Sequence, residues 1–429
     1  MRQIANLSYR KTGCQPVLHK ETFVENKFAA IKEKNFELFR QEFEEQRTIG
    51  RALPVQVWLE TTTRCNLNCR MCPRRYGPPH TGSDMPLDVF KRVEEALFPT
   101  LKHVELQGWG EPLFAENFEA FYDSACRHGV RVSFITNGTL LTRAWLERFV
   151  RDDVGLMISV DGATNDTMRY VRGITLDRVE EAIRRYNEIK TAVTTSRSNL
   201  HIVFVAMRRN LEELPALIER AAKEWRAASL LAVHLQRAGL PPEMRDEHLS
   251  TDPDRADAVF VESFQLARQL GLTLELPPLF GKRARGEDAA AARAMAAEAE
   301  KQSYHYCGLG LFRSSDQRNP YPNRCPDPWL KSYVEVNGNV RPCCAYGRVF
   351  GNLARQPFGD IWNGPLYRRL RRKIHSGVPP LLCRECNVIY GIAGGNPDSL
   401  LAQLGPVDRA IVAAQRAKRR YHLWRERQK

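Results

Sequence analysis

Two features that would place a protein in or across a membrane are missing from this chain. It has no run of about 18 consecutive apolar residues, and its N-terminus has no apolar secretory signal. Eleven cysteines are spread over 429 residues, which does not fit the disulfide scaffold of a short secreted domain. Because 43% of the residues are apolar, the chain can bury a large core in two or three domains. The sequence predicts a cytoplasmic protein with no membrane as a partner.

Acidic residues are scarce at the C-terminus of a chain whose formal net charge is +14. The last 21 residues contain eight Lys or Arg and one acidic residue, so much of the excess lies in a basic tail, residues 396–429. A solvated helix with a cationic face is the simplest interpretation. The functional alternatives are docking of an acidic electron donor such as a flavodoxin, or of an acidic substrate, whereas a nucleic acid is not expected.

A fourth ligand is missing from the tightest group of cysteines. Cys65, Cys69 and Cys72 have the spacing C-x3-C-x2-C directly after an apolar segment, and no further Cys or His follows before His80. Structural zinc normally has four ligands, so this group fits a zinc site poorly. A four-iron cluster that is bound by three thiolates keeps one iron open for another ligand. The spacing therefore predicts a 4Fe-4S cluster at these three cysteines.

An alternation of strand-like and helical segments begins at residue 54 and continues to about residue 236. Such units form a parallel sheet with helices outside, and ligands bind at the carboxyl ends of the strands. We expect an α/β fold of six β/α units, whose first strand leads into the cysteine loop. Strands are expected at 55–60, 103–107, 131–136, 155–160, 201–206 and 230–236, with helices at 87–97, 118–128, 143–150, 176–189 and 211–224.

Three further motifs follow successive predicted strands: GWGE at 108–111, TNG at 136–138 and SVDG at 159–162. Their order, together with the cysteine spacing, resembles the radical S-adenosylmethionine (SAM) superfamily. The resemblance implies a (β/α)6 partial TIM barrel over 54–240, in which SAM binds the open iron. Trp109 interrupts the family's usual glycine pair, so the contacts of the two glycines are expected to be displaced. The resemblance implies these SAM-binding residues: Met71, Gly108, Gly110, Glu111, Asn137, Ser159 and Asp161.

A second cysteine set lies in the C-terminal third: Cys325, Cys343, Cys383 and Cys386. A zinc ribbon is one alternative, since C-x2-C pairs also suit tetrahedral zinc. The order of the cysteines resembles the SPASM domain, which carries auxiliary iron-sulfur clusters. No cysteine follows Cys386. The resemblance therefore implies one auxiliary 4Fe-4S cluster in a domain of residues 321–395, after a bridging segment of 241–320, and similarity to the dehydrogenase that oxidises 2-deoxy-scyllo-inosamine.

The resemblance also implies the chemistry: SAM is cleaved reductively, and the 5'-deoxyadenosyl radical abstracts a substrate hydrogen. We expect oxidation of a small polar metabolite in natural-product biosynthesis, with the auxiliary cluster accepting an electron. A peptide-modifying maturase is the first alternative, although the helical extension at 1–53 is short for a leader-peptide module. The second is an epimerase in which Cys307 donates hydrogen to the substrate radical. A non-enzymatic zinc or nucleic-acid-binding protein is the third.

Overall fold

The computed structural model describes residues 21–76, 82–235, 240–277, 280, 325–344, 346–376, 380 and 383. Cys307, Cys386, most of the bridging segment and the basic tail lie outside these residues. Among the described helices, none is both long enough and apolar enough to cross a membrane.

Ten strands form a single sheet, in the order β10-β9-β8-β1-β2-β3-β4-β5-β6-β7. Neighbouring strands from β8 to β7 in this order are parallel, and β9 and β10 continue the sheet with antiparallel pairs. The strands are β1 (Gln56–Leu59), β2 (His103–Leu106), β3 (Arg131–Thr136), β4 (Gly155–Ser159), β5 (Asn199–Ala206), β6 (Ser229–His234), β7 (Thr273–Glu275), β8 (Lys331–Val334), β9 (Asn339–Arg341) and β10 (Gly351–Asn352).

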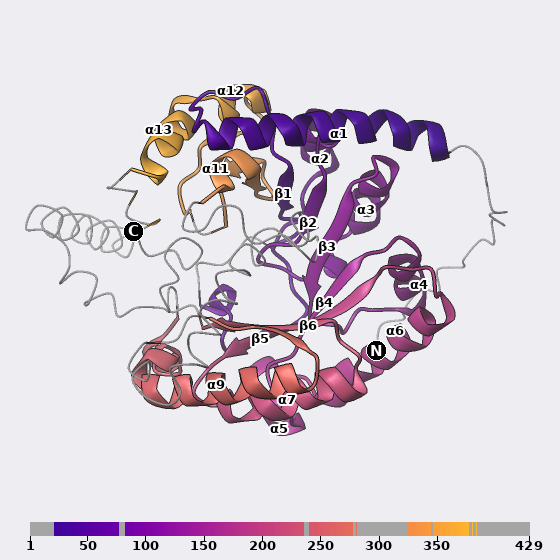
Figure 1. Cartoon of the computed structure of the whole chain (residues 1–429), viewed down its shortest axis with the longest axis vertical. Coiled ribbons are helices and arrows are strands. Elements are labelled where there is room, and N and C mark those ends of the chain that lie inside the picture. Colours follow the sequence, from indigo (N-terminus) through magenta and orange to yellow (C-terminus); the bar gives the residue numbers. More distant parts are fainter. Residues whose placement is uncertain are drawn as a thin grey trace, which may run out of the picture.

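The helices that alternate with the strands lie outside the curved sheet (Figure 1). Those of the barrel and its neighbouring segment are α2 (Leu87–Leu97), α3 (Phe118–Arg127), α4 (Arg143–Arg151), α5 (Asn165–Arg172), α6 (Leu176–Ala192), α7 (Leu214–Glu219), α8 (Pro242–Arg245) and α9 (Pro253–Gln269). The remaining helices lie together in the upper part of Figure 1, where α2 also lies beside α1: α1 (Glu21–Glu44), α11 (Asp327–Leu330), α12 (Phe358–Trp362) and α13 (Pro365–Ile374).

The six predicted β/α units are confirmed, and two parallel strands were not predicted as part of their sheet. β7 extends the sheet beyond β6. β8, from the C-terminal third, pairs with β1 in the register Gln56 with Lys331 to Leu59 with Val334. The C-terminal cysteine region is therefore built onto the edge of the barrel through backbone hydrogen bonds.

The two faces of the sheet differ in polarity because side chains alternate along each strand. Val57, Leu59, Val104 and Phe134 are fully buried beneath the outer helices. The alternate positions, such as Trp58 and Glu105, face the inside of the barrel. An apolar outer layer thus supports the fold, while the inner face carries the polar side chains that chemistry requires.

Helix α1 and the residues between it and β1 contact the C-terminal cysteine region. Phe43 packs edge-on against Trp329 of α11, with ring centroids 5.4 Å apart. The indole N–H of Trp362 donates to Ala52 O at 2.8 Å, and Arg371 Nη1 donates to Thr48 O at 3.1 Å. These contacts hold the region around Cys325 against the start of β1.

Candidate cofactor and substrate site

The cysteine loop that follows β1 is fixed to the barrel by its own backbone. Arg70 N–H donates to Val171 O of α5 at 2.8 Å, and Cys72 N–H donates to Cys69 O at 3.2 Å. Cys69 is buried in a small apolar cluster with Met71, whereas Cys65 and Cys72 are partly exposed. The loop therefore holds one thiol inside the protein and two at its edge.

The surroundings of these thiols disfavour the thiolate form, so a bound cationic group such as iron is needed to stabilise it. Burial, with smaller contributions from Cys72 and Cys65, raises the pKa of the Cys69 thiol to about 11. Burial also raises the pKa of Cys65. Iron binding must therefore displace protons from these thiols. Within the described residues, no three Cys, His, Asp or Glu side chains are grouped as one metal ion requires.

The GWGE segment is hydrogen-bonded to the start of the cysteine loop. Gly110 N–H donates to Thr62 O at 3.1 Å, and Glu111 N–H donates to Arg64 O at 2.9 Å. A Cβ on Gly110 would lie 2.3 Å from Arg64 O and 2.5 Å from Thr62 O. Only glycine permits so close an approach of two backbones. Gly108 and Gly110 are thereby placed beside the loop that carries the cysteines.

Glu111 is buried and connects the GWGE segment to the TNG turn. Thr136 Oγ1 donates to Glu111 Oε1 at 2.6 Å, and Asn137 N–H donates to Oε2 at 2.8 Å. Burial raises the pKa of Glu111 to about 7 despite these hydrogen bonds. Asn137 Nδ2 donates in turn to Asn66 Oδ1 of the cysteine loop at 2.9 Å. Glu111 and Asn137 therefore fix the turn beside the loop, and their contact with SAM stays a prediction.

Ser159 and Asp161 lie at the carboxyl end of β4, both buried. Asp161 Oδ1 accepts from Val205 N–H at 2.7 Å, and Oδ2 accepts from Arg172 Nε at 2.6 Å. Because both carboxylate oxygens already accept hydrogen bonds, Asp161 anchors β5 and α5 around the cysteine loop. The proximity to SAM that the sequence predicts for Ser159 and Asp161 is not tested by these contacts.

Glu60 is a site residue that the sequence analysis missed. Its Oε1 accepts from Trp109 N–H at 3.1 Å and from the Tyr333 hydroxyl at 3.2 Å, and its Oε2 accepts from Val336 N–H at 3.2 Å. The carboxylate, 3% exposed, thus joins the GWGE segment to strand β8. Glu60 belongs to no motif, so the only sequence signal for it was its position at the end of the first predicted strand.

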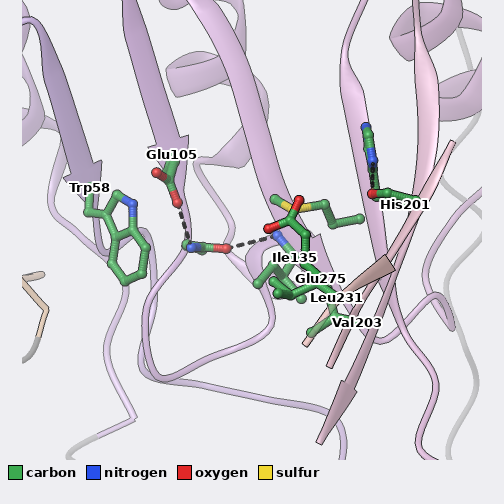
Figure 2. Close-up of a pocket in the computed structure, with 10 residues that line it drawn as sticks. Trp58, Glu105, Ile135, His201, Val203, Leu231 and Glu275 are labelled. Atoms are coloured by element: carbon green, nitrogen blue, oxygen red, sulfur yellow. Dashed lines mark hydrogen bonds between the residues drawn. The ribbon is translucent and has the colours of Figure 1, made fainter. Parts of the chain in front are cut away.

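The inside of the barrel contains a small pocket (Figure 2). Gln107 connects two strands there, because its Nε2 donates to Glu105 Oε2 and its Oε1 accepts from Ile135 N–H, both at 2.9 Å. His201 Nδ1 lies 2.8 Å from Ser229 Oγ. The lining side chains come from β1 to β7 and the end of β2: Trp58, Glu105, Gln107, Ile135, Met157, His201, Val203, Ser229, Leu231 and Glu275.

The structure brings three of the four C-terminal cysteines toward one place. Cys325 and Cys383 are buried in one apolar cluster, against which Tyr346 packs. Burial, followed by the nearby Cys383 and Cys343 thiols, raises the pKa of Tyr346. Tyr346 N–H also donates to Cys343 O at 3.4 Å, so Cys343 lies close to the cluster that contains Cys325 and Cys383.

Two known protein families match this chain, and each match covers one of the two cysteine regions. Residues 59–247 match the Radical SAM superfamily, and residues 325–387 match SPASM, an iron-sulfur cluster-binding domain. A tungsten-containing aldehyde ferredoxin oxidoreductase cofactor-modifying protein of Pyrococcus furiosus is 30% identical, over 77% of this chain and 87% of that protein. An AdoMet-dependent heme synthase of Methanosarcina barkeri is 27% identical, over 73% and 83%.

A maturase and a structure with a bound precursor peptide are also similar to this chain. Mycofactocin maturase MftC of Mycobacterium ulcerans is 28% identical, over 82% of this chain and 85% of that protein. The crystal structure of Streptococcus suis SuiB bound to precursor peptide SuiA superposes with a TM-score of 0.58 at 16% identity, covering 86% of this chain and 77% of that one. The expected similarity to 2-deoxy-scyllo-inosamine dehydrogenase has no support from these relatives. The cysteine loop, the sheet and the matched sequences show that this chain belongs to the radical SAM superfamily and carries a SPASM domain.

Proposed function

We propose that this protein is a peptide-modifying maturase, which abstracts a hydrogen atom from one residue of a peptide substrate. The observation that carries the proposal is the set of relatives: mycofactocin maturase, the subtilosin biosynthesis protein AlbA and PqqA peptide cyclase all match this chain. The first is named as a maturase, the second as a bacteriocin biosynthesis protein and the third as a cyclase of a peptide. The sequence-based preference for a small metabolite gives way to the alternative that the sequence analysis ranked first.

The radical SAM domain binds a 4Fe-4S cluster and SAM, and the SPASM domain binds a further iron-sulfur cluster. These cofactors supply the 5'-deoxyadenosyl radical and a second redox centre when bound. In the proposed site, Cys65, Cys69 and Cys72 hold the first cluster. Cys325, Cys343, Cys383 and Cys386 hold the second, of which the first three are described and fit such a group.

The chain's remaining task is to place SAM and one substrate C–H bond together and to exclude water. Met71, Gly108, Gly110, Glu111, Asn137, Ser159 and Asp161 are the proposed SAM-binding set. Gly110 supports this role because its missing Cβ allows the GWGE backbone to reach the cysteine loop. Glu111 and Asn137 hold the adjacent turn in a fixed position.

The barrel pocket is the proposed site of the residue that is modified. Its lining combines apolar side chains with the polar groups of Glu105, Gln107 and His201, as substrate pockets commonly do, so we place one residue of the peptide there and the rest of the peptide outside. Glu105 is oriented by Gln56 and Gln107, and His201 contacts Ser229. Fixed polar groups of this kind orient a substrate residue at low entropic cost.

A second candidate is oxidation of a small non-peptide molecule, including the dehydrogenation that the sequence analysis expected. The cofactor-modifying protein and the heme synthase, both similar over more than 70% of this chain, favour it. Epimerisation with Cys307 as hydrogen donor also stays a prediction, and Cys307 lies outside the described residues.

The deciding experiment follows deuterium from substrate to 5'-deoxyadenosine. Anaerobic holoenzyme is incubated with SAM, dithionite and a candidate peptide encoded beside the gene, prepared with deuterated side chains. Deuterium in 5'-deoxyadenosine and a mass change in the peptide are expected, and both should be absent from a Cys65→Ala variant. Deuterium transfer from a small metabolite, with every tested peptide left unmodified, would contradict the proposal.

The Glu105→Gln variant tests the pocket. It should lower peptide modification while SAM cleavage without peptide stays unchanged, because Glu105 lines the pocket inside the barrel, whereas the three cysteines lie in the loop after β1. Glu95→Gln, on the outer surface of α2, is the matched control and should leave both reactions unchanged.

A further inference from the structure

A strongly basic surface lies beside the cysteine loop and has no part in the site described above. It consists of Arg70, Arg75, Arg208 and Arg209, here named the arginine face, with Tyr170 among them. All four arginines are exposed. Arg70 directly follows Cys69, and Arg75 is the last residue of the short helical turn, Pro73–Arg75, that begins after Cys72.

Contacts join the two segments that carry these arginines. The guanidinium carbons of Arg70 and Arg209 lie 4.3 and 4.0 Å from the centroid of the Tyr170 ring. Arg208 Nη1 donates to Asp246 O at 3.4 Å, a backbone acceptor that leaves its charge unbalanced. Stacking on Tyr170 holds two cations close together, although they repel each other.

The face keeps most of its positive charge. Arg209 forms an ion pair with Glu247, in which the nitrogen and oxygen are 3.5 Å apart. Within the described part of the chain, no carboxylate forms an ion pair with Arg70, Arg75 or Arg208. Uncompensated like charges cost free energy, so an arrangement of this kind calls for a functional explanation.

We propose that the arginine face is the docking surface for an acidic protein that delivers single electrons to the first cluster. The electron leaves the reduced donor and is gained by the cluster, with no proton transfer between the two proteins. The face is the exposed side of the loop whose buried side holds Cys69. Met71, Met207 and Met244 are buried next to this face, in the same apolar cluster as Cys69.

Charge complementarity identifies the partner's chemistry. Transient redox complexes bury small interfaces, and opposite charges accelerate their association without tight binding. An acidic flavodoxin fits this requirement, and docking of such a donor was one of the alternatives that the sequence left open for the basic tail. The present proposal needs only the first cluster and does not depend on which substrate is modified.

The test measures electron transfer directly, with flavodoxin hydroquinone as the probe. Holoenzyme is mixed anaerobically with the probe by stopped flow, and reduction of the first cluster is followed by its absorbance and by EPR. We expect Arg70→Glu/Arg208→Glu to lower the second-order rate constant at low ionic strength by about tenfold or more. Its rate should also depend less on salt, because steering charges have been removed.

A matched control separates local docking from bulk charge. Arg92→Glu/Arg184→Glu changes the net charge equally, at exposed positions on α2 and α6. It should alter the flavodoxin rate by less than about twofold. Dithionite, a small reductant, should reduce all variants at the same rate. Iron content shows that the cluster is intact, and Arg70→Gln/Arg208→Gln, which adds no negative charge, should give an intermediate rate.

Equal slowing of the arginine-face variant and the control would overturn the proposal, because bulk charge would then explain the effect. An unchanged rate in the arginine-face variant would overturn it as well. If deletion of residues 409–429 alone slowed flavodoxin, docking would belong to the basic tail. None of these outcomes depends on peptide modification, so the failure of the two proposals can be told apart.

Discussion

Replacement of Glu60 should weaken both the barrel and the SAM site, since this carboxylate connects two segments that are distant in sequence. It accepts hydrogen bonds from Trp109 N–H, the Tyr333 hydroxyl and Val336 N–H, at 3.1, 3.2 and 3.2 Å. The first donor belongs to the GWGE segment, and the other two belong to β8 and the residues after it. Glu60 therefore couples the proposed SAM site to the SPASM region.

The expected loss of unfolding free energy follows from the number of buried donors that lose their acceptor. A buried donor without a partner costs about 1–3 kcal/mol. Glu60→Ala strands three donors, so it should lower the free energy of unfolding by about 3–6 kcal/mol, allowing for partial entry of water. Glu60→Gln keeps one oxygen and turns an NH2 group toward a donor, so about 1–3 kcal/mol is expected.

Anaerobic urea titration measures the stability of the holoprotein, and equilibrium dialysis measures its dissociation constant for SAM. For Glu60→Gln we expect that constant to rise about tenfold, the equivalent of 1.4 kcal/mol, because the GWGE backbone loses one of its anchors. Hydrogen exchange should become faster at 108–111 and 333–337, the two segments that Glu60 joins.

Glu42→Gln is the matched control. Glu42 is also a buried carboxylate, and it accepts from Arg51 N–H at 2.6 Å and Ala52 N–H at 3.2 Å, between α1 and β1. It should lower stability by a similar amount and leave SAM binding unchanged. The reasoning would be refuted if both variants weakened SAM binding equally, or if Glu60→Gln left stability and exchange at the wild-type level.

Three further outcomes follow from individual contacts. Gly110→Ala should lower iron content and SAM binding in the purified protein, because its Cβ would lie 2.3 Å from Arg64 O; normal values for both would contradict the close approach. Burial lowers the pKa of His103 to about 3. The neutral ring therefore adds stability above pH 6.5 that is lost as the pH falls, and relative to His103→Gln the wild type should lose about 2 kcal/mol between pH 7 and pH 5 in urea titrations; parallel pH profiles would exclude this. Arg172→Gln should lower the free energy of unfolding by about 3–5 kcal/mol, since it leaves Asp161 buried without its ion-pair partner, and a loss below about 1 kcal/mol in the same titration would show that the pair is not needed.

The barrel was predictable because its signals are local. Segments such as 131–136 and 155–160 have the composition of buried strands, and the helices between them have a clear apolar face. The three cysteines at 65–72 lie within one loop, so their spacing alone predicted a cluster. The apolar periodicity of a strand or helix depends only on its own backbone geometry, so it can be recognised without knowing the rest of the fold.

The pairing of β8 with β1 could not be predicted in this way. Lys331–Val334 is a run of four residues, too short for a reliable alternation, and its partner Gln56–Leu59 lies more than 270 residues earlier. The contact between Tyr333 and Glu60 depends on that pairing. A glutamate beside a cysteine motif has many possible partners in sequence, and the sheet selects one of them.

The cysteines predict the clusters but not the substrate, which is why a small-metabolite dehydrogenase was expected. The number of cysteines after residue 320 bears on how many redox centres the chain can hold, and thus on which electron steps are available. In the proposed site, by contrast, the substrate would meet the side chains that line the barrel pocket, such as Trp58, Glu105 and His201. These come from separate strands and form no motif, because each is a single inward-facing position. Enzymes with the same clusters can therefore accept a peptide or a small molecule, and the pocket residues, rather than the cysteines, are the positions where substitutions should change the substrate.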